Sequence, residues 1–415
     1  MQAVKQQVVI TGLGAICGAG HGVEALWQSV CDADSAIDVL NPEDQLDVDG
    51  IKITRAAQVP DYEPAEHFDN EQLALLDRHS QFAVLAARQA IDDAGLEADS
   101  DTLRHAAAII GSGCGGKHTD EDTYAQLYKQ QRKRAHPLTI PKGMPSAAAS
   151  MVSFHLGIQG PVFSVSSACS SSAHAIAQAA MMIQTGMVDV AIAGGADAPF
   201  TYGLLKAWEA VRVVSNDTCR PFSKDRSGMV LGEGAGIIVL ESEAHARRRD
   251  ANIYARLLGY GMSADAGHIT RPDVPGIQRV LSQALTHAGI NPEQVDYVNA
   301  HGTATQANDI AETKALHQVF GPALKKLPVS STKAVHGHTL GATSALELIA
   351  TTCAMRHNTV PPTANFTEAD EQCDIDCVPG EARDQRIDIA LSSSFAFGGL
   401  NAVLVLQNWP NLTTL

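Results

Sequence analysis

The chain has 415 residues, a formal net charge of −16 at pH 7 and a hydrophobic fraction of 45%. This length favours two domains or two fused halves, and the acidic balance argues against nucleic acid as a partner. The hydrophobic fraction together with 34 glycines suits a compact α/β enzyme. No apolar run approaches the ~18 residues of a membrane span, so no span is expected.

The N-terminal sequence MQAVKQQVVITGLG indicates a first β-strand and not an export signal, because its short apolar run is soon broken by glycines. We therefore expect a cytoplasmic protein whose eight cysteines stay reduced. Gly12 and Gly14 are similar to part of a dinucleotide-binding fingerprint, but the third glycine is missing and further glycines interrupt the helix, so no such site is expected. Cys373 and Cys377 lack a second pair, and no metal site is predicted.

The first 250 residues alternate apolar, amphipathic and polar segments. The expected elements are, in order, an amphipathic helix from about Gln72 to Ala94, a strand at 106–110, a polar stretch at 117–146, a small-residue helix at 147–156, a strand at 163–165, a strand at 190–194, a helix near 203–210 and a strand at 236–240. Ser242 should cap a short charged helix, and we place the boundary between two halves after it, at residues 252 and 253.

The second half of the chain repeats landmarks of the first. The octet QAIDDAGL at 89–96 corresponds to QALTHAGI at 283–290, and VSSAC at 165–169 corresponds to VSSTK at 329–333. The landmarks lie about 30 residues further apart in the first half, and the polar stretch at 117–146 is the natural place for this insertion. The duplication predicts two similar α/β halves, with Cys169 and Lys333 at equivalent strand-to-helix joints.

Cys169 lies where a short apolar strand meets an almost uncharged helical run. The N-terminus of a helix favours a thiolate, so we expect a nucleophile there, although an isolated cysteine is more often buried and inert. His301 and His338 also follow predicted strands, although a lone histidine is more often structural. Because the carboxyl ends of strands form the binding edge of such sheets, we expect these three residues to meet in one site.

The motifs around these residues are specific. SSACSSSAHAI, RPFSKDRSGMVLGEGAG, VNAHGTAT, SSTKAVHGH and FAFGGLN together make nearly the whole chain resemble the β-ketoacyl-acyl-carrier-protein synthases of the thiolase superfamily, closest to the type II elongating enzymes. The resemblance implies an α/β thiolase fold, in which duplicated βαβαβαββ halves form a five-layered α-β-α-β-α core. Residues 1–252 would carry the nucleophile and the insertion, and residues 253–415 the histidine, lysine and gate motifs.

The same resemblance implies decarboxylative Claisen condensation of malonyl-carrier protein with an acyl chain held on Cys169. His301 and His338 would stabilise the enolate as neutral N–H donors. The backbone N–H groups of Cys169 and Phe397 would form the oxyanion hole, and Phe397 would also be the gate over the cysteine. The pathway is left open between fatty acid synthesis and specialised polyketide or polyene synthesis, and departures from the family pattern favour the specialised one.

Further site residues are carried over from the family pattern. Lys333 and Glu347 would order the site. The residues expected along the substrate are Thr303, Thr305, Phe395 and Cys114. For Phe395, simple core packing is an equal alternative. Cys114 stands where the family often has a larger aliphatic residue, which predicts room for longer, unsaturated or aryl-terminated chains.

The expected partners are an acyl carrier protein and a second synthase subunit. The carrier's phosphopantetheine holds the substrates, so no cofactor of the enzyme itself and no metal are expected. Dimerisation is expected through the segments 147–156 and 163–165, either with itself or with a chain-length-factor-like homologue. The usual basic cluster ahead of Asp77 is absent, so docking is expected at Arg212 and other surfaces or on a partner subunit.

Two alternative functions differ in sequence features. A chain-length-factor-like partner subunit without its own condensing activity would be expected to lack the nucleophile, which is present here. A synthase that only starts chains from acyl-CoA would be expected to carry Cys-His-Asn, whereas this chain has His338 in the lysine segment.

Overall fold

The computed structural model describes residues 6–42 and 49–409. Its strands are β1 Val8–Cys17, β2 Gly20–His21, β3 Asp38–Val39, β4 Arg55–Ala56, β5 Ala107–Gly111, β6 Val162–Val165, β7 Val190–Asp197, β8 Gly234–Ser242, β9 Ala255–Ala264, β10 Tyr297–Asn299, β11 Val329–Ser330, β12 Thr359–Val360, β13 Arg383–Asp384, β14 Ile389–Ala396 and β15 Leu400–Asn408. Its α-helices are α1 Val23–Cys31, α2 Asn70–Leu75, α3 Arg78–Asp93, α4 Asp101–Arg104, α5 Lys117–Tyr128, α6 Thr139–Gly143, α7 Ala147–Leu156, α8 Ser171–Gln184, α9 Tyr202–Val211, α10 Glu243–Arg248, α11 Val274–Ala288, α12 Gln306–Phe320, α13 Lys333–His336 and α14 Thr343–His357.

The two halves of the chain have the same topology. The first half contributes strands in the order β1-β8-β7-β5-β6 and the second in the order β9-β15-β14-β10-β11, so corresponding strands hold corresponding places. A short antiparallel pairing of β1 with β9 joins the two sets. Along the chain each half reads βαβαβαββ, with α3, α7 and α8 corresponding to α11, α12 and α14. The duplication predicted from the sequence is therefore confirmed.

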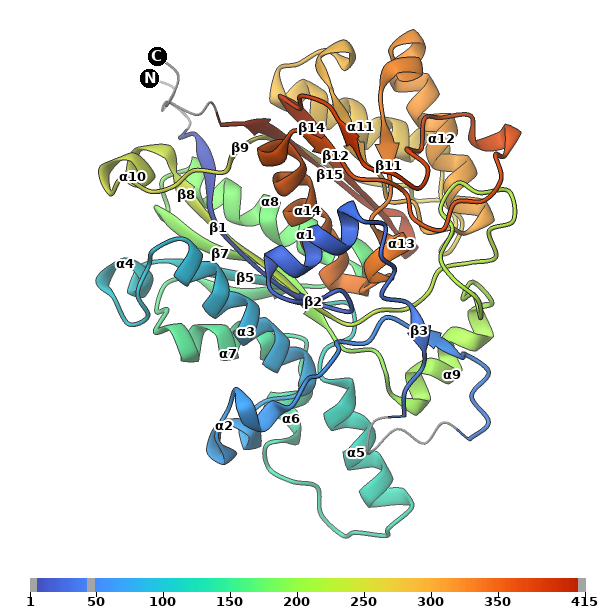
Figure 1. Cartoon of the computed structure of the whole chain (residues 1–415). Helices are drawn as coiled ribbons and strands as arrows, with labels where there is room; N and C mark the ends of the chain where they lie inside the picture. The colour runs from blue at the N-terminus through green and yellow to red at the C-terminus, as the bar shows by residue number, and fades with distance from the viewer. Residues whose placement is uncertain (1–5, 43–48, 410–415) are drawn as a thin grey trace.

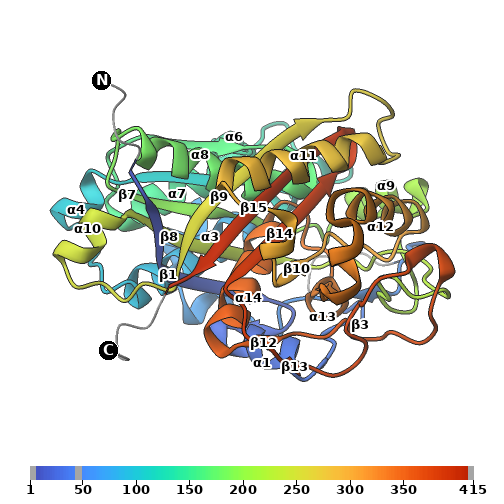
Figure 2. The ribbon, with the colours of Figure 1, turned by 90° about the horizontal axis from the view of Figure 1, so that it is seen from above.

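The helices form three layers around the two sets of strands. Helix α3 packs on β1, β8 and α7, and α11 packs on β9, β15 and α12, so these four helices form the outer layers. Helices α8 and α14 contact each other and strands of both sets, and they lie near the centre of the molecule (Figure 1). Figure 2 shows α11 lying along the strands of the second half. The five-layered α-β-α-β-α core is confirmed.

The two octets of the repeat, 89–96 and 283–290, lie at the C-terminal ends of the equivalent helices α3 and α11. Helix α3 is followed by Gly95 at a φ of 64° and α11 by Gly289 at a φ of 69°, both in the left-handed region that glycine adopts most easily. Cys169 follows β6 and precedes α8, and Lys333 follows β11 and precedes α14, as the repeat predicts. The predicted boundary at residues 252 and 253 lies between α10 and β9 and stays a prediction.

Two elements differ from the sequence prediction. The expected single helix from Gln72 to Ala94 is wrong, because the chain is extended at Leu76 and Asp77 then caps α3. The Asp77 carboxylate also accepts hydrogen bonds from the backbone N–H and the hydroxyl of Thr119, at 2.8 and 2.7 Å. This tertiary contact with α5 accompanies the break in the helix.

Strand β1 continues through Gly12 and Gly14 instead of ending before them. A Cβ atom at Gly12 would lie 2.1 Å from the Ala90 carbonyl oxygen, and one at Gly14 would lie 2.0 Å from that of Ala86. The two glycines let β1 and α3 approach closely, which is how the sequence TGLG is used here.

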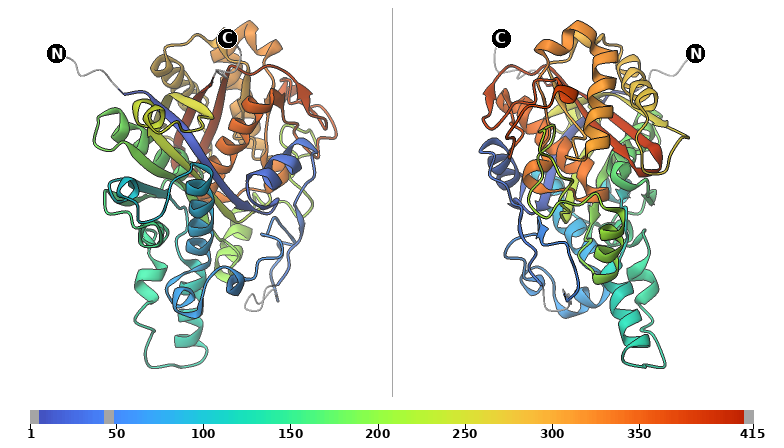
Figure 3. Two further views of the ribbon diagram at one scale, coloured as in Figure 1. Left: turned by 60° about the vertical axis from the view of Figure 1, so that its left-hand side comes forward. Right: turned by 90° about the vertical axis from the view of Figure 1, so that its right-hand side faces the viewer.

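Helices α5 and α6 project from the core. They lie between β5 and α7, whereas residues 300–305 alone join the corresponding β10 and α12. Figure 3 shows α5 and the loop after it extending below the rest of the molecule. Among the described residues, no helix is long and apolar enough to cross a membrane.

Candidate active site

Cys169 lies in a tight turn between β6 and α8. Ala168 before it has a φ of 51°, a strained conformation for a residue with a Cβ atom. The hydroxyl of Ser171 stabilises this turn, because it donates to the Ala168 carbonyl at 2.6 Å and accepts from the Ser167 N–H at 2.9 Å. The run of small hydroxylated residues thus fixes the elbow that presents the cysteine.

Cys169 opens into a cavity of about 330 Å³. Other predicted site residues that line it are His301, His338, Thr303, Thr305, Phe395 and Phe397. These side chains come from the segments that follow β10 and α13, from the end of β14 and the turn after it, and from the elbow, so the fold brings together segments that are far apart in sequence. The hydroxyl oxygens of Thr303 and Thr305 lie 2.9 Å apart on one wall.

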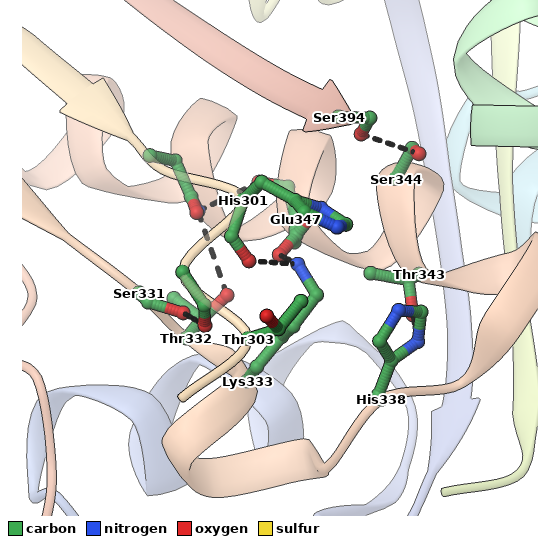
Figure 4. Close-up of polar contacts among 12 residues, drawn as sticks. His301, Thr303, Ser331, Thr332, Lys333, His338, Thr343, Ser344, Glu347 and Ser394 are labelled. Atoms are coloured by element: carbon green, nitrogen blue, oxygen red, sulfur yellow. Dashed lines mark hydrogen bonds and ion pairs between the residues drawn. The ribbon is translucent and has the colours of Figure 1, made fainter. Parts of the chain in front are cut away.

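His301 is held by charged side chains bound to its backbone. Its N–H and that of Gly302 each donate to one oxygen of the Glu312 carboxylate, both at 2.8 Å. Its carbonyl accepts from the Lys333 ammonium at 2.6 Å, and Lys333 is also paired with Glu347 (Figure 4). The imidazole Nδ1 of His301 has no hydrogen-bond partner in the described part of the chain.

His338 has a defined tautomer. Its Nδ1 accepts from the Leu340 N–H at 3.0 Å and lies 3.2 Å from the Thr343 hydroxyl. A backbone N–H can only donate, so Nδ1 is the unprotonated nitrogen and the neutral ring carries its proton on Nε2. His301 and His338 have ring centroids 5.7 Å apart, and their planes are nearly perpendicular.

Both histidines are neutral at physiological pH. Burial lowers the pKa of each well below its ordinary value, and the positive charge of Lys333 lowers both further. Lys333 and Glu347 are fully buried and do not line the cavity. Their contact with the His301 backbone suits a positioning role and not direct contact with a substrate.

Two backbone N–H groups converge on the Cys169 sulfur. They belong to Phe397 and to Cys169 itself. Phe397 begins a tight turn in which Gly398 and Gly399 have φ values of 82° and 70°. The turn is tied to the neighbouring loop, since the Gly398 N–H donates to the Ile269 carbonyl at 2.7 Å.

The position of Cys169 at the N-terminus of a helix does not lower the pKa of its thiol below the ordinary value. Burial raises the pKa of the Cys169 thiol to about 11, although the charge of Lys333 and the two N–H groups act in the opposite direction. Cys169 is 8% exposed, so the loss of water around the sulfur outweighs these favourable interactions. The resting enzyme therefore holds a thiol, and thiolate forms only in a small fraction of molecules near pH 7.

This raised pKa predicts a steep pH dependence of alkylation. Below the pKa the thiolate fraction increases tenfold per pH unit, so the rate of iodoacetamide labelling at Cys169 should rise about tenfold per unit between about pH 7 and 10. Peptide mass spectrometry with short labelling times measures this rate, and model thiols with a pKa near 9 provide the reference. A plateau already at pH 8 would contradict the raised pKa.

Cys114 lies outside this cavity. It packs against a hydrophobic cluster that includes Leu205, Met229 and Leu340, and its N–H donates to the Asp197 carboxylate at 3.0 Å. Its predicted role beside the acyl chain stays a prediction.

Sequence reasoning missed three residues around the site. Glu312 fixes the backbone of His301; it lies in α12, which continues directly from the VNAHGTAT segment, and its burial is visible only in the structure. The Asp197 carboxylate accepts hydrogen bonds from the backbone N–H groups of Gly113 and Gly341. It therefore connects the loop after β5 with the segment before α14. Trp208 lines the cavity beside Phe397, and no sequence pattern marks it.

Comparisons with known proteins agree with this arrangement. Family models for the N-terminal and C-terminal domains of β-ketoacyl synthases match residues 5–246 and 254–367. The chain belongs to the β-ketoacyl synthase family. It is 46% identical to nodulation protein E of Rhizobium sp. (strain N33), with 97% of this chain and 100% of that protein covered. It is 42% identical to 3-oxoacyl-[acyl-carrier-protein] synthase 2 of Coxiella burnetii, with 97% and 99% covered.

Solved structures of this family are also similar. The ishigamide ketosynthase/chain length factor matches with a TM-score of 0.92 and 34% identity, over 98% of this chain and 100% of that one. The ketosynthase complex AntDE:AntF, a type II polyketide synthase with its acyl-carrier protein, matches with a TM-score of 0.87 and 30% identity, over 98% and 100%.

The family assignment settles the class of activity. This β-ketoacyl synthase is a condensing enzyme of the acyltransferase class with the thiolase-like fold, as predicted. The alternative of a partner subunit without condensing activity is not favoured.

Proposed function

We propose that Cys169 is the acyl-accepting nucleophile and that His301 and His338 are the enolate-stabilising donors of this synthase. The observation that supports these roles most strongly is their shared cavity, in which two neutral imidazoles and a thiol converge. The Nε2–H of His338 suits a donor to a developing oxyanion, because its tautomer is fixed by the Leu340 N–H.

In the first proposed step, the Cys169 sulfur attacks the thioester carbonyl of an acyl chain on phosphopantetheine. The phosphopantetheine thiol leaves and takes up the proton that Cys169 gives up. The N–H groups of Cys169 and Phe397, which converge on the sulfur in the resting site, would donate to the oxyanion of the tetrahedral intermediate. This use of the two groups is consistent with their orientation in the free enzyme.

In the second step, malonyl-carrier protein loses its carboxylate as CO₂. The bonding electrons move into an enolate whose oxygen accepts hydrogen bonds from His301 and His338. The enolate carbon attacks the acyl-Cys169 carbonyl, a carbon–carbon bond forms, and the Cys169 sulfur leaves and regains a proton. Thr303 and Thr305 are proposed to hold the pantetheine arm, with Phe395 lining the site.

The pathway that we propose is a specialised one. A 46% identity to nodulation protein E exceeds the 42% and 39% identities to the 3-oxoacyl-[acyl-carrier-protein] synthases 2 of Coxiella burnetii and Staphylococcus aureus. The similarity to the ishigamide ketosynthase/chain length factor also favours a specialised pathway.

No cofactor or metal of the enzyme itself enters the proposed steps. A cytoplasmic location is proposed as well, and the eight free cysteines are consistent with it.

Stepwise reconstitution tests the proposed function. The enzyme is incubated with an octanoyl-carrier protein, and intact-protein mass spectrometry should show one octanoyl adduct, located on the Cys169 peptide. Malonyl-carrier protein is then added, and the adduct should disappear as a β-ketoacyl product forms on the carrier. A protein that never acquires an acyl adduct from any carrier-bound chain would refute the proposal.

We also propose that Cys114, which lies outside the cavity of Cys169, borders the bound acyl chain, and a larger side chain at this position tests that role. Cys114→Phe should reduce acylation of Cys169 by long or bulky chains about tenfold while acetyl and butyryl transfer change little, because a larger side chain shortens the acyl pocket. Cys114→Ser is the size-matched control. Equal losses for every chain length would indicate misfolding, and unchanged transfer of long chains would place Cys114 outside the pocket.

Dimerisation is proposed at the free edge of the first half. Strand β6 is the last strand of its sheet, and exposed apolar side chains lie on it and on the neighbouring helix, with Phe154 68% and Phe163 39% exposed. Docking of an acidic carrier protein is proposed at the cavity mouth, where Arg212 and Arg271 lie.

Light scattering on the chain expressed alone tests the dimer. A mass of twice 43.8 kDa is expected for a homodimer, and poor solubility that a co-expressed synthase homologue relieves is expected for a heterodimer. A stable and active monomer would contradict both forms of the proposal.

A further inference from the structure

Trp208 on α9 is the aromatic neighbour of Phe397. The two ring centroids lie 6.1 Å apart with an interplanar angle of 32°, within the range of favourable aromatic contacts. Both side chains line the cavity that contains Cys169. The Phe397 backbone is fixed by its approach to the cysteine sulfur and by the contacts of the glycine turn, so its side chain is the part that can change position.

Trp208 also packs against the hydrophobic cluster on which Cys114 packs. Leu205, Met229 and Leu340 belong to this cluster, and Met229 lines the cavity as well. The indole therefore contacts both the Phe397 ring and this cluster. A displacement of the Phe397 ring toward Trp208 would need the volume that the indole occupies.

No hydrogen bond fixes the indole. Its Nε1 is buried without a partner in the described part of the chain, although a buried tryptophan N–H usually finds one. Helix α9 is itself anchored at this level, because the Lys206 ammonium donates to the Gly50 carbonyl at 2.9 Å. The position of the indole is thus set by packing between Phe397 and the hydrophobic cluster on a fixed helix.

We infer that Trp208 is a specificity-determining residue that limits the width of the acyl group able to pass Phe397 and reach Cys169. The inference rests on the proposed roles of Cys169 and Phe397. The indole restrains the Phe397 ring, so a flexible straight chain passes while a group that is broad next to its carbonyl is hindered. Replacing the indole by a smaller side chain gives Phe397 room to move aside.

The test compares two thioester probes in the full-length enzyme. Octanoyl- and benzoyl-N-acetylcysteamine are used, because they need no carrier-protein docking, and acylation of Cys169 is followed by intact-protein mass spectrometry. Trp208→Ala and the bulkier Trp208→Leu should raise the ratio of benzoyl to octanoyl transfer about tenfold, and Trp208→Phe should stay within about twofold of the wild type. Leu205→Ala is the control, since it loosens the same cluster but does not line the cavity.

The outcomes separate this inference from the proposed function. An unchanged ratio in acylation-competent Trp208→Ala and Trp208→Leu variants would overturn the specificity role. Equal losses of octanoyl and benzoyl transfer in these variants would show that Trp208 has a structural role only. A ratio of benzoyl to octanoyl transfer that Leu205→Ala raises to the same extent would assign the effect to the hydrophobic cluster and not to the indole. A wild-type enzyme that neither probe nor any acyl-carrier protein acylates would refute the proposed function itself and this inference with it.

Discussion

Replacing Cys169 by serine should abolish acyl transfer while the fold is kept. The hydroxyl is a far weaker nucleophile than the thiol, so transfer should fall at least about a thousandfold. The hydroxyl can still accept from the two N–H groups that face the sulfur, so the free energy of unfolding should change by less than about 2 kcal/mol. Acylation is measured by intact-protein mass spectrometry with octanoyl-carrier protein, and stability by thermal unfolding.

Cys353→Ser is the matched control for this change. Cys353 is also buried, but it lies in α14 within the main hydrophobic core and away from the cavity. This variant should lose stability without losing acylation by the folded protein. An acyl adduct on the Cys169→Ser variant, or one that maps to another cysteine of the wild type, would exclude Cys169 as the nucleophile.

The sequence predicted the features that depend on repetition and local pattern. The paired octets and the paired VSS segments were sufficient to anticipate two halves with Cys169 and Lys333 at equivalent joints, because a duplicated unit must repeat its strand and helix order. The helix Ala147–Leu156 has the predicted bounds, since its small apolar residues are bordered by Ser146 and Gly157. Local chemistry is sufficient in such cases.

The features that the sequence did not predict depend on burial and tertiary contacts. The helix-dipole argument for a Cys169 thiolate considered one turn of chain, whereas burial by the surrounding protein raises the pKa of its thiol. Asp77 looked like one more polar residue of a helix until its contact with Thr119 was visible. Trp208 is a single residue on an ordinary amphipathic helix, and its contact with Phe397 connects residues that are far apart in sequence.

Removing either cavity histidine should separate acyl transfer from decarboxylation. His301→Ala and His338→Ala should still accept an octanoyl group on Cys169, because the two backbone N–H groups at the sulfur are unchanged. Each should lose about 10²–10³-fold in the release of CO₂ from malonyl-carrier protein, since one donor to the enolate oxygen is missing. Pre-acylated enzyme is mixed with labelled malonyl-carrier protein, and the released label is counted. His336→Asn is the control, because His336 is buried in the same segment but does not line the cavity.

The tautomer of His338 makes this prediction more specific. His338→Asn should retain part of the decarboxylation activity that His338→Ala loses, because an amide is also a neutral N–H donor.

The imidazoles have pKa values well below their ordinary range, so CO₂ release by pre-acylated wild-type enzyme should be nearly constant between about pH 6.5 and 8.5. Over the same interval alkylation of Cys169 should rise steeply, because it requires the thiolate. A decarboxylation rate that falls as the pH rises through about 7 would mean that a protonated imidazole is needed, and wild-type CO₂ release in both alanine variants would exclude the proposed role of the histidines.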